Sequence, residues 1–260
     1  MVSALGWVAV LLACLLWPAT AHPEEEVRNV LYVSGQVMSL ESDAVGGGGG
    51  LEWWHQLSAS SAFTLGAFAF SLADSHWAYG KTGLSLSYPT GTSVSANASL
   101  GGGRRLRDDF IYQVGEVEVT QALIDKRLYL VGGDQYAHVS RSQENLVKAG
   151  LLVYPIPMLA IRANYHHSLG GNVDSQFVSG RADLTLARLT LLAGFLLGRT
   201  TPERFNVITN TARAVRSEEF FAGISVPLGR HEVTVVYDLA RQGSPWIDKH
   251  TILLVWKIPF

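Results

Sequence analysis

The chain has 260 residues, a formal net charge of -2, and only 16% charged residues, against about 25% in a typical soluble domain. The near-balanced charge excludes a strongly basic nucleic-acid binder and a polybasic membrane-surface protein. The single cysteine excludes a disulfide framework, a cysteine-based zinc site and an iron–sulfur cluster, and we predict no cofactor. Low charge with 48% hydrophobic residues indicates strands in which apolar and small polar side chains alternate.

The N-terminal segment has the features of an export signal. The apolar run Leu5–Trp17 is followed by Ala19-Thr20-Ala21, a small-residue cleavage site. The run is shorter than the roughly 20 residues that a membrane-spanning helix needs. We therefore expect a signal peptide at 1–21 and a mature chain at 22–260. Lipid modification of Cys14 and a buried N-terminal helix are the alternatives.

The mature chain shows period-two alternation over about ten residues at a time, followed each time by turn residues. Residues 92–100, for example, place Val, Ala, Ala and Leu on one face and Ser, Ser, Asn and Ser on the other. No later apolar run is long enough for a spanning helix, which excludes a helical membrane protein. Strands are expected at 27–40, 51–58, 62–72, 79–88, 92–101, 109–121, 126–138, 145–154, 158–168, 176–187, 189–199, 216–226, 230–241 and 249–260.

Short and longer links alternate between these segments. The short links lie at 59–61, 89–91, 122–125, 155–157, 188 and 227–229. The longer links lie at 41–50, 73–78, 102–108, 139–144, 169–175, 200–215 and 242–248. This asymmetry is typical of outer-membrane barrels, which have short periplasmic turns and longer extracellular loops. We predict an all-β fold, an antiparallel up-and-down transmembrane β-barrel of about 14 strands (about 12 to 16 remain open) in the bacterial outer membrane.

The last strand supports this interpretation. Phe260, Ile258, Trp256, Leu254 and Ile252 share one face of an alternating segment that ends in an aromatic residue. Such an ending resembles the assembly signal of bacterial outer-membrane barrels, so the assembly machinery is an expected partner through strand pairing. A secreted soluble sandwich would also alternate, but the loop asymmetry and the terminal Phe favour a membrane barrel.

Each strand should present one face to lipid. The predicted lipid-facing residues are Val33, Leu57, Leu84, Leu86, Val94, Val117, Val119, Leu151, Val153, Ile161, Leu184, Leu186, Leu191, Phe195, Ile224 and Val235. Aromatic residues near strand ends suit the membrane interface. The predicted girdle residues are Trp53, Tyr88, Tyr129, Tyr165, Trp246 and Trp256.

Charged and amide side chains should point into the lumen, because a cationic side chain facing lipid costs about 2–4 kcal/mol near the midplane. The predicted lumen residues are Gln36, Glu52, Gln56, Ser85, Glu116, Glu118, Lys148, Arg162, Asn164, His166, Arg181, Asp183, Glu219, Glu232, Asp238 and Lys257. They carry both signs of charge. Polar lumen residues such as Ser93 and Asn97 can bind sugar hydroxyls, whereas few aromatic residues are expected inside.

Three other segments contain residues that could bind or react. His166-x-Ser168-x-Gly170 is similar to the His and Ser arrangement of outer-membrane phospholipase A, but both side chains share the predicted inner face, so no catalytic residue is predicted. Gly46–Gly50 is expected to be a flexible extracellular loop. Gly101–Asp109 is expected to be a polar loop whose three arginines are either solvated or bound to lipopolysaccharide phosphates.

The stretch Gly49-Gly50-Leu51-Glu52-Trp53-Trp54-His55-Gln56, with the repeated hairpins and the terminal aromatic strand, resembles YaiO-like outer-membrane β-barrel proteins. These are similar to the barrel part of exopolysaccharide export porins. The resemblance implies saccharide export, and no catalytic residue comes with it. The fused periplasmic helical repeats of the large export porins have no counterpart in the sequence, so an export scaffold would be a separate periplasmic partner.

A barrel of about 14 strands is intermediate in width between barrels whose interior is filled by side chains and barrels that enclose a wide aqueous channel. The first functional hypothesis is a passive channel for saccharide export or small-solute passage, in contact with outer-membrane lipid and lipopolysaccharide. The alternatives are a barrel enzyme acting on envelope lipid or polysaccharide, and a structural barrel without an open pore.

Overall fold

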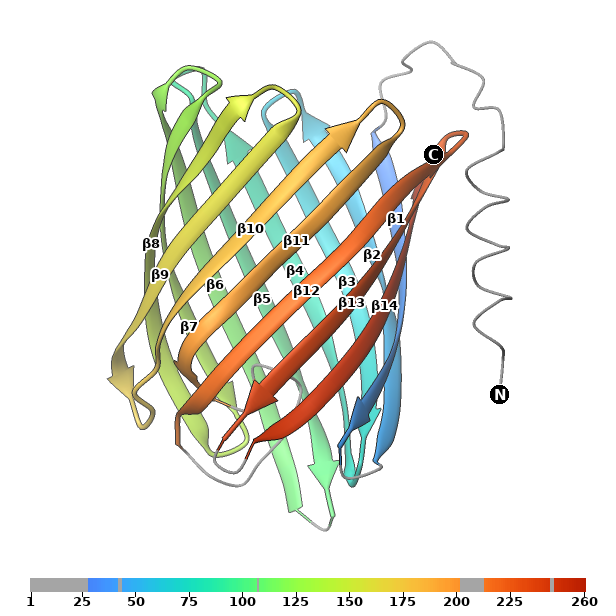
Figure 1. The fold of residues 1–260 in the computed structure, drawn as a ribbon, viewed down its shortest axis with the longest axis vertical. Coiled ribbons are helices and arrows are strands. Elements are labelled where there is room, and N and C mark those ends of the chain that lie inside the picture. The colour runs from blue at the N-terminus through green and yellow to red at the C-terminus, as the bar shows by residue number, and fades with distance from the viewer. Residues whose placement is uncertain (1–27, 42–43, 107, 202–212, 244–245) are drawn as a thin grey trace.

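The computed structural model describes residues 28–41, 44–106, 108–201, 213–243 and 246–260. The chain forms 14 strands, and each pairs antiparallel with its neighbours in sequence. The first strand also pairs with the last, from Val30 opposite Pro259 to Leu40 opposite Lys249, and this seam closes the barrel (Figure 1). The predicted antiparallel up-and-down barrel and its strand number are confirmed.

The strands contain between 11 and 17 residues, which is enough for a tilted strand to cross a hydrocarbon core of about 25–30 Å. Their bounds are β1 (Asn29–Leu40), β2 (Val45–Ser58), β3 (Ser61–Leu72), β4 (Ser75–Ser87), β5 (Thr92–Arg105), β6 (Asp108–Ile124), β7 (Leu128–Val139), β8 (Ser142–Ile156), β9 (Leu159–Gly171), β10 (Gln176–Leu186), β11 (Leu189–Thr200), β12 (Val215–Leu228), β13 (His231–Gln242) and β14 (Ile247–Pro259). Across the described ranges, no helix is long and apolar enough to cross a membrane. The predicted signal peptide at 1–21, with Cys14, lies outside the described residues.

The links between strands lie at the two ends of the barrel. We call the end where β1 begins and β14 ends the proximal end, at the top of Figure 1, and the opposite end the distal end. Several distal links are shorter than predicted, since only Ala73 and Asp74 join β3 to β4, and only Ser140 and Arg141 join β7 to β8. Ala73 and Ser140 adopt positive φ angles of 51° and 58°, which close tight turns without the Gly or Asn that marks such turns in a sequence.

The inner face of the barrel is identified by contacts that skip a strand. Lys148 of β8 reaches Glu118 of β6 across β7, which is possible only on the concave side. Residues directly opposite one another share a face, so the pairing assigns inside and outside along every strand. Predicted lipid-facing residues such as Val33, opposite Trp256, and Val235, opposite Leu254, lie outside.

One predicted girdle residue is on the wrong face. Tyr129 lies opposite Ala122 of β6 and Leu152 of β8 on the inner face, where its ring meets Tyr154 edge-on at 5.9 Å. The alternation around Tyr129 is ambiguous in sequence, because apolar residues stand on both sides of it. Trp53, Tyr165 and Trp256 lie outside as predicted.

Candidate lumen site

A charged row crosses three strands in the middle of the barrel. Glu118 of β6, Gly133 of β7 and Lys148 of β8 are directly opposite one another on the inner face. Gly133 has no side chain, so Lys148 Nζ passes over it and lies 2.6 Å from Glu118 Oε2. Lys148 also binds Glu116, and Arg162 Nη2 of β9 lies 2.5 Å from the same Glu118 oxygen. Four predicted lumen residues therefore form one ionic cluster.

The same arrangement of acid, small residue and lysine occurs twice more. Glu52, Gly66 and Lys81 are aligned across β2, β3 and β4, and Lys81 Nζ lies 2.6 Å from Glu52 Oε2. Glu219, Ala240 and Lys249 are aligned across β12, β13 and β14. Pairing with carboxylates is what makes a lysine tolerable in a packed interior.

Lys81 and Lys249 were not predicted as lumen residues. Lys249 is 5% exposed and has the carboxyls of Asp238 and Glu219 as its charged neighbours. Sequence parity alone would have found both lysines, since each falls on the polar face of an alternating strand.

The remaining predicted lumen residues also lie on the inner face, in smaller groups. Lys257 Nζ lies 3.5 Å from Glu232 Oε2, and Arg181 Nε lies 2.9 Å from Asp183 Oδ1. Asn164 Oδ1 accepts a hydrogen bond from Arg162 Nε at 3.4 Å, beside the central cluster. Gln36 and Gln56 both face inward from the first two strands, and Ser85 lies opposite Ala62.

The predicted face of the His-x-Ser stretch is as expected, but the two side chains do not pair. His166 Nε2 lies 3.1 Å from Ser179 Oγ, and its ring stacks on Phe177 at 4.2 Å. The Ser168 hydroxyl donates to the backbone carbonyl of Val173 at 3.0 Å and is 9% exposed. A serine held in this way has no general base beside it, so the geometry gives no activated nucleophile.

An aromatic layer lines the distal half of the lumen, contrary to the expectation of few inward aromatics. Tyr79 of β4 stacks on Phe68 at 5.1 Å and on Tyr112 at 4.6 Å, between ring centroids. Phe70 stacks on Trp77 at 5.5 Å in the next row. We call these five residues the aromatic layer.

Glycines flank each row of the aromatic layer. Gly50 lies opposite Phe68 and Gly48 opposite Phe70, while Gly101 and Gly103 face Tyr79 and Trp77. A Cβ on Gly48 would stand 2.2 Å from a Phe70 ring carbon, so the rings lie flat on bare backbone.

The two glycine-rich segments are therefore strands rather than loops. Gly46–Gly50 belongs to β2 and Gly101–Gly103 to β5. The prediction of loops was wrong because glycine, usually unfavourable in a strand, is here required by aromatic rings on the neighbouring strand. The three arginines predicted for the second loop do not form one group. Arg104 and Arg105 lie on opposite faces of β5, and Arg104 Nε lies 3.6 Å from Asp109 Oδ1. Arg107 lies outside the described residues.

The inner face is packed most completely at the distal end. Inward distal residues are buried, among them Met38 at 0%, Trp77 at 3% and Ser217 at 0% exposure. Met38, Leu72, Trp77 and Val139 form a hydrophobic cluster there, joined by much of the aromatic layer. Towards the proximal end the inner face is mixed, since Ser85 and Thr185 are exposed whereas Val30, Val131 and Leu192 are buried. The distal end is therefore the more tightly packed end of the lumen, and we call it the distal constriction.

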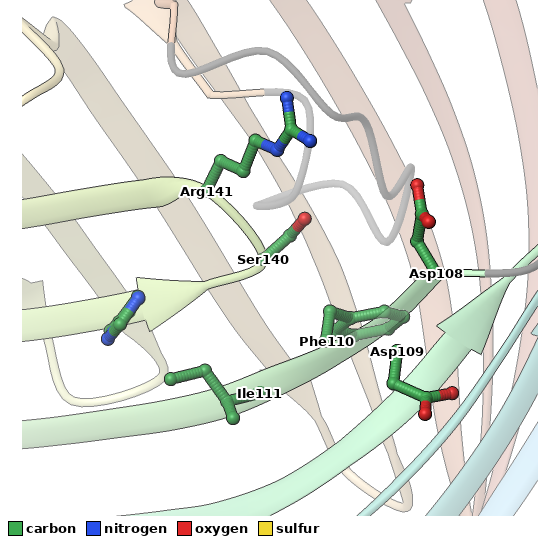
Figure 2. Close-up of a pocket in the computed structure, with 7 residues that line it drawn as sticks. Asp108, Asp109, Phe110, Ile111, Ser140 and Arg141 are labelled. Atoms are coloured by element: carbon green, nitrogen blue, oxygen red, sulfur yellow. The ribbon is translucent and has the colours of Figure 1, made fainter.

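A separate pocket of about 550 Å³ lies on the distal rim, between the start of β6 and the β7–β8 turn (Figure 2). Asp108, Asp109 and Phe110 line one side, and Ser140 and Arg141 stand across from them. It is lined by both signs of charge, and its Phe110 packs against the distal hydrophobic cluster of the inner face. In the described parts of the chain, no group of three or more His, Cys, Asp or Glu residues could hold a metal ion.

No family model and no curated protein sequence matches the chain. Among solved structures, it is similar to CymD, a monoaromatic hydrocarbon channel, with a TM-score of 0.62 and 10% identity over 91% of this chain and 89% of that one. The P. putida toluene transporter TodX gives a TM-score of 0.60 and 12% identity, covering 92% and 91% of the two chains. Omp33, an outer membrane protein of Acinetobacter baumannii, gives 0.55 and 14%, covering 91% of this chain and 100% of its own. At these identities the likeness establishes the fold, that of a bacterial outer-membrane β-barrel, and it agrees with the predicted location.

Proposed function

We propose that this chain is a passive channel of the bacterial outer membrane for small solutes. The observation that carries the proposal is the lining of the lumen, in which solvent reaches inward residues such as Ser85 and Thr185, while Trp77 and Met38 pack the distal constriction. A lumen that is partly lined by exposed polar residues and packed by side chains at one end suits small molecules rather than polymers. The barrel fold shared with channels supports the same conclusion.

Small saccharides are the first solute class that we propose. The central lumen offers paired charges, as in Glu118 with Lys148, which can bind hydroxyl groups without selecting strongly for either ion sign. The aromatic layer lies further towards the distal end, and the ring of Tyr112, which stacks on Tyr79, offers apolar surface to sugar rings. The resemblance to YaiO-like proteins points to the same class.

Small aromatic compounds are the second candidate. The aromatic layer presents stacked rings, and offset stacking on such rings favours planar apolar solutes. CymD and TodX are described as a monoaromatic hydrocarbon channel and a toluene transporter. The solute assay therefore includes both classes.

Export of a long polysaccharide with a separate periplasmic scaffold is less favoured. A polymer would have to thread the distal cluster of Met38, Leu72, Trp77 and Val139, which fills its part of the lumen. An enzymatic role is also less favoured, because Ser168 donates its hydrogen bond to a backbone carbonyl rather than to His166.

The test is reconstitution of the full mature barrel in planar bilayers and in liposomes. We expect small single-channel conductance, and liposome swelling with mono- and disaccharides that stops for larger oligosaccharides. Block of the current by toluene but not by sugars would favour the second solute class. Folded protein, verified by its heat-modifiable gel mobility, that gives neither conductance nor swelling would contradict the channel proposal.

A further inference from the structure

Three arginines gather on the outer face of the barrel at its distal end. Arg199 is the penultimate residue of β11, Arg216 the second residue of β12, and Arg241 the penultimate residue of β13. Arg199 and Arg216 are directly opposite each other in the sheet. Like charges in directly opposed positions destabilise a strand pair, so this pairing needs a compensating negative charge.

Among the described residues, carboxylates compensate only part of this charge. Arg216 Nη2 lies 3.0 Å from Glu218 Oε1, and Arg241 Nε lies 3.3 Å from Asp248 Oδ1. Arg199 has no side-chain partner within the part of the chain that the structure describes. Over the described ranges, three guanidinium groups thus share two carboxylates, and the surplus positive charge lies on the Arg199–Arg216 pair.

The outer surface on the proximal side of the arginines is arranged in rows. Phe195 of β11, Phe220 of β12 and Leu239 of β13 are directly opposite one another and form an apolar band. The next row towards the distal end contains Leu197, Glu218 and Arg241, again directly opposite one another. The Arg199–Arg216 pair comes last.

Trp246 indicates where this distal edge lies relative to the membrane. Its ring centroid lies 5.2 Å from Arg216 Cζ, and tryptophan is typical of the interface between hydrocarbon and headgroups. The guanidinium groups therefore lie at the level of the lipid headgroups, and the apolar band lies at the level of the hydrocarbon.

We propose that the distal end, where the longer links are predicted, faces the cell exterior, and that the Arg199–Arg216 pair, assisted by Arg241, binds the phosphate groups of lipopolysaccharide in the outer leaflet. Guanidinium groups bind phosphate with two parallel hydrogen bonds, and a phosphate between the opposed arginines removes their repulsion. The order of apolar band, ion pairs and arginines matches the order of acyl chains and phosphates in that lipid. The Arg104–Arg107 stretch, in contrast, divides Arg104 and Arg105 between the two faces of β5.

The inference is independent of the proposed channel function, because it concerns only the outer surface. The test uses the full mature barrel in detergent and native mass spectrometry of the folded protein, with three probes: intact lipopolysaccharide, the same lipopolysaccharide after chemical dephosphorylation, and inorganic phosphate. Variants are Arg199→Gln with Arg216→Gln, and the control is Arg104→Gln, which removes an outward distal arginine from another part of the wall.

We expect the double variant to lose at least about tenfold in affinity for intact lipopolysaccharide, the loss that one charge-assisted hydrogen bond corresponds to. Arg104→Gln should bind as the wild type does, and dephosphorylated lipopolysaccharide should bind the wild type as weakly as intact lipopolysaccharide binds the double variant. Unchanged affinity in the double variant, an equal loss in Arg104→Gln, or binding of inorganic phosphate as tight as that of the lipid would each overturn the assignment. Gel mobility before and after heating verifies that each variant is folded.

Discussion

Lys148 Nζ and Glu118 Oε2 lie 2.6 Å apart although their strands are not neighbours, because Gly133 on the strand between them leaves the space above the sheet empty. This relationship explains how a barrel with few charged residues concentrates them into clusters. A side chain at the middle position would force the lysine and the carboxylate apart.

The first prediction tests this middle position. In Gly133→Val, the new Cβ would stand 2.7 Å from Lys148 Cε and 2.7 Å from the Val117 carbonyl oxygen, so the ion pair must separate. We expect a loss of roughly 2 kcal/mol in the free energy of unfolding, measured by urea titration in lipid vesicles. Gly132→Val is the matched control, because its Cβ on the outer face meets nothing within 4 Å. Equal losses in the two variants would argue against the pair as the cause.

The second prediction concerns ion selectivity. Lys148→Met removes one positive charge from the central cluster and leaves Glu116 and Glu118 with only Arg162. The channel should become more selective for cations, seen as a shift in reversal potential under a KCl gradient. Adding Glu118→Gln to Lys148→Met should return the reversal potential towards the wild-type value. A reversal potential that does not move in Lys148→Met would mean that ions do not pass this cluster.

The third prediction concerns the distal constriction. Trp77→Ala removes the most bulky member of the buried distal cluster, where Trp77 is 3% exposed. The unfolding free energy should fall by about 3–5 kcal/mol, as for other buried large-to-small changes. Single-channel conductance should rise at the same time, because the constriction widens. Trp53→Ala, an outward change at the proximal end, should leave the conductance unchanged, and a rise in both variants would locate the constriction elsewhere.

Some features of the barrel follow from the sequence alone, and others depend on how the strands pair. The barrel, its strand number and the inward position of residues such as Glu118 and Lys148 follow from period-two alternation, which a lipid-facing wall imposes on every strand. The aromatic layer could not be predicted in the same way. Glycine has no side chain, so Gly46–Gly50 shows no alternation in the sequence. Which of these glycines lie opposite Phe68 and Phe70 depends on the register between β2 and β3.

The distal links were also mispredicted, for a local reason. Ala73 and Ser140 turn the chain with positive φ angles that their residue types rarely adopt. The residues of the ionic cluster, by contrast, are predicted one by one but not as a cluster, because a contact across an intervening glycine depends on the register between neighbouring strands.

A fourth prediction comes from a carboxylate on the outer face. Asp134 lies midway along β7, directly opposite Val117 and Val147, and faces outward. A carboxylate facing hydrocarbon is unfavourable, by less than the roughly 2–4 kcal/mol of a cationic side chain at the midplane. Asp134→Leu should therefore raise the unfolding free energy in lipid vesicles by about 1 kcal/mol. Asp183→Leu, which removes an inward carboxylate paired with Arg181, should not stabilise the barrel. A less stable Asp134→Leu would mean that this carboxylate has a favourable partner in the membrane.

The last prediction concerns assembly. Phe260 is 68% exposed and follows β14, whose outward residues Trp256 and Leu254 pair with β1 at the seam that closes the barrel. Until β14 pairs with β1 it has a free edge, and the aromatic ring of Phe260 beside that edge suits recognition by the assembly machinery through strand pairing. Phe260→Ala should therefore slow insertion into membranes that contain the machinery, measured as the rate at which heat-modifiable protein appears. Spontaneous folding of the same variant into pure lipid vesicles should change little, since the contact of Phe260 across the seam is a backbone hydrogen bond to the Asn29 carbonyl at 3.0 Å, which alanine retains. An equal slowing in pure vesicles would show instead that the ring acts through its own contact with lipid.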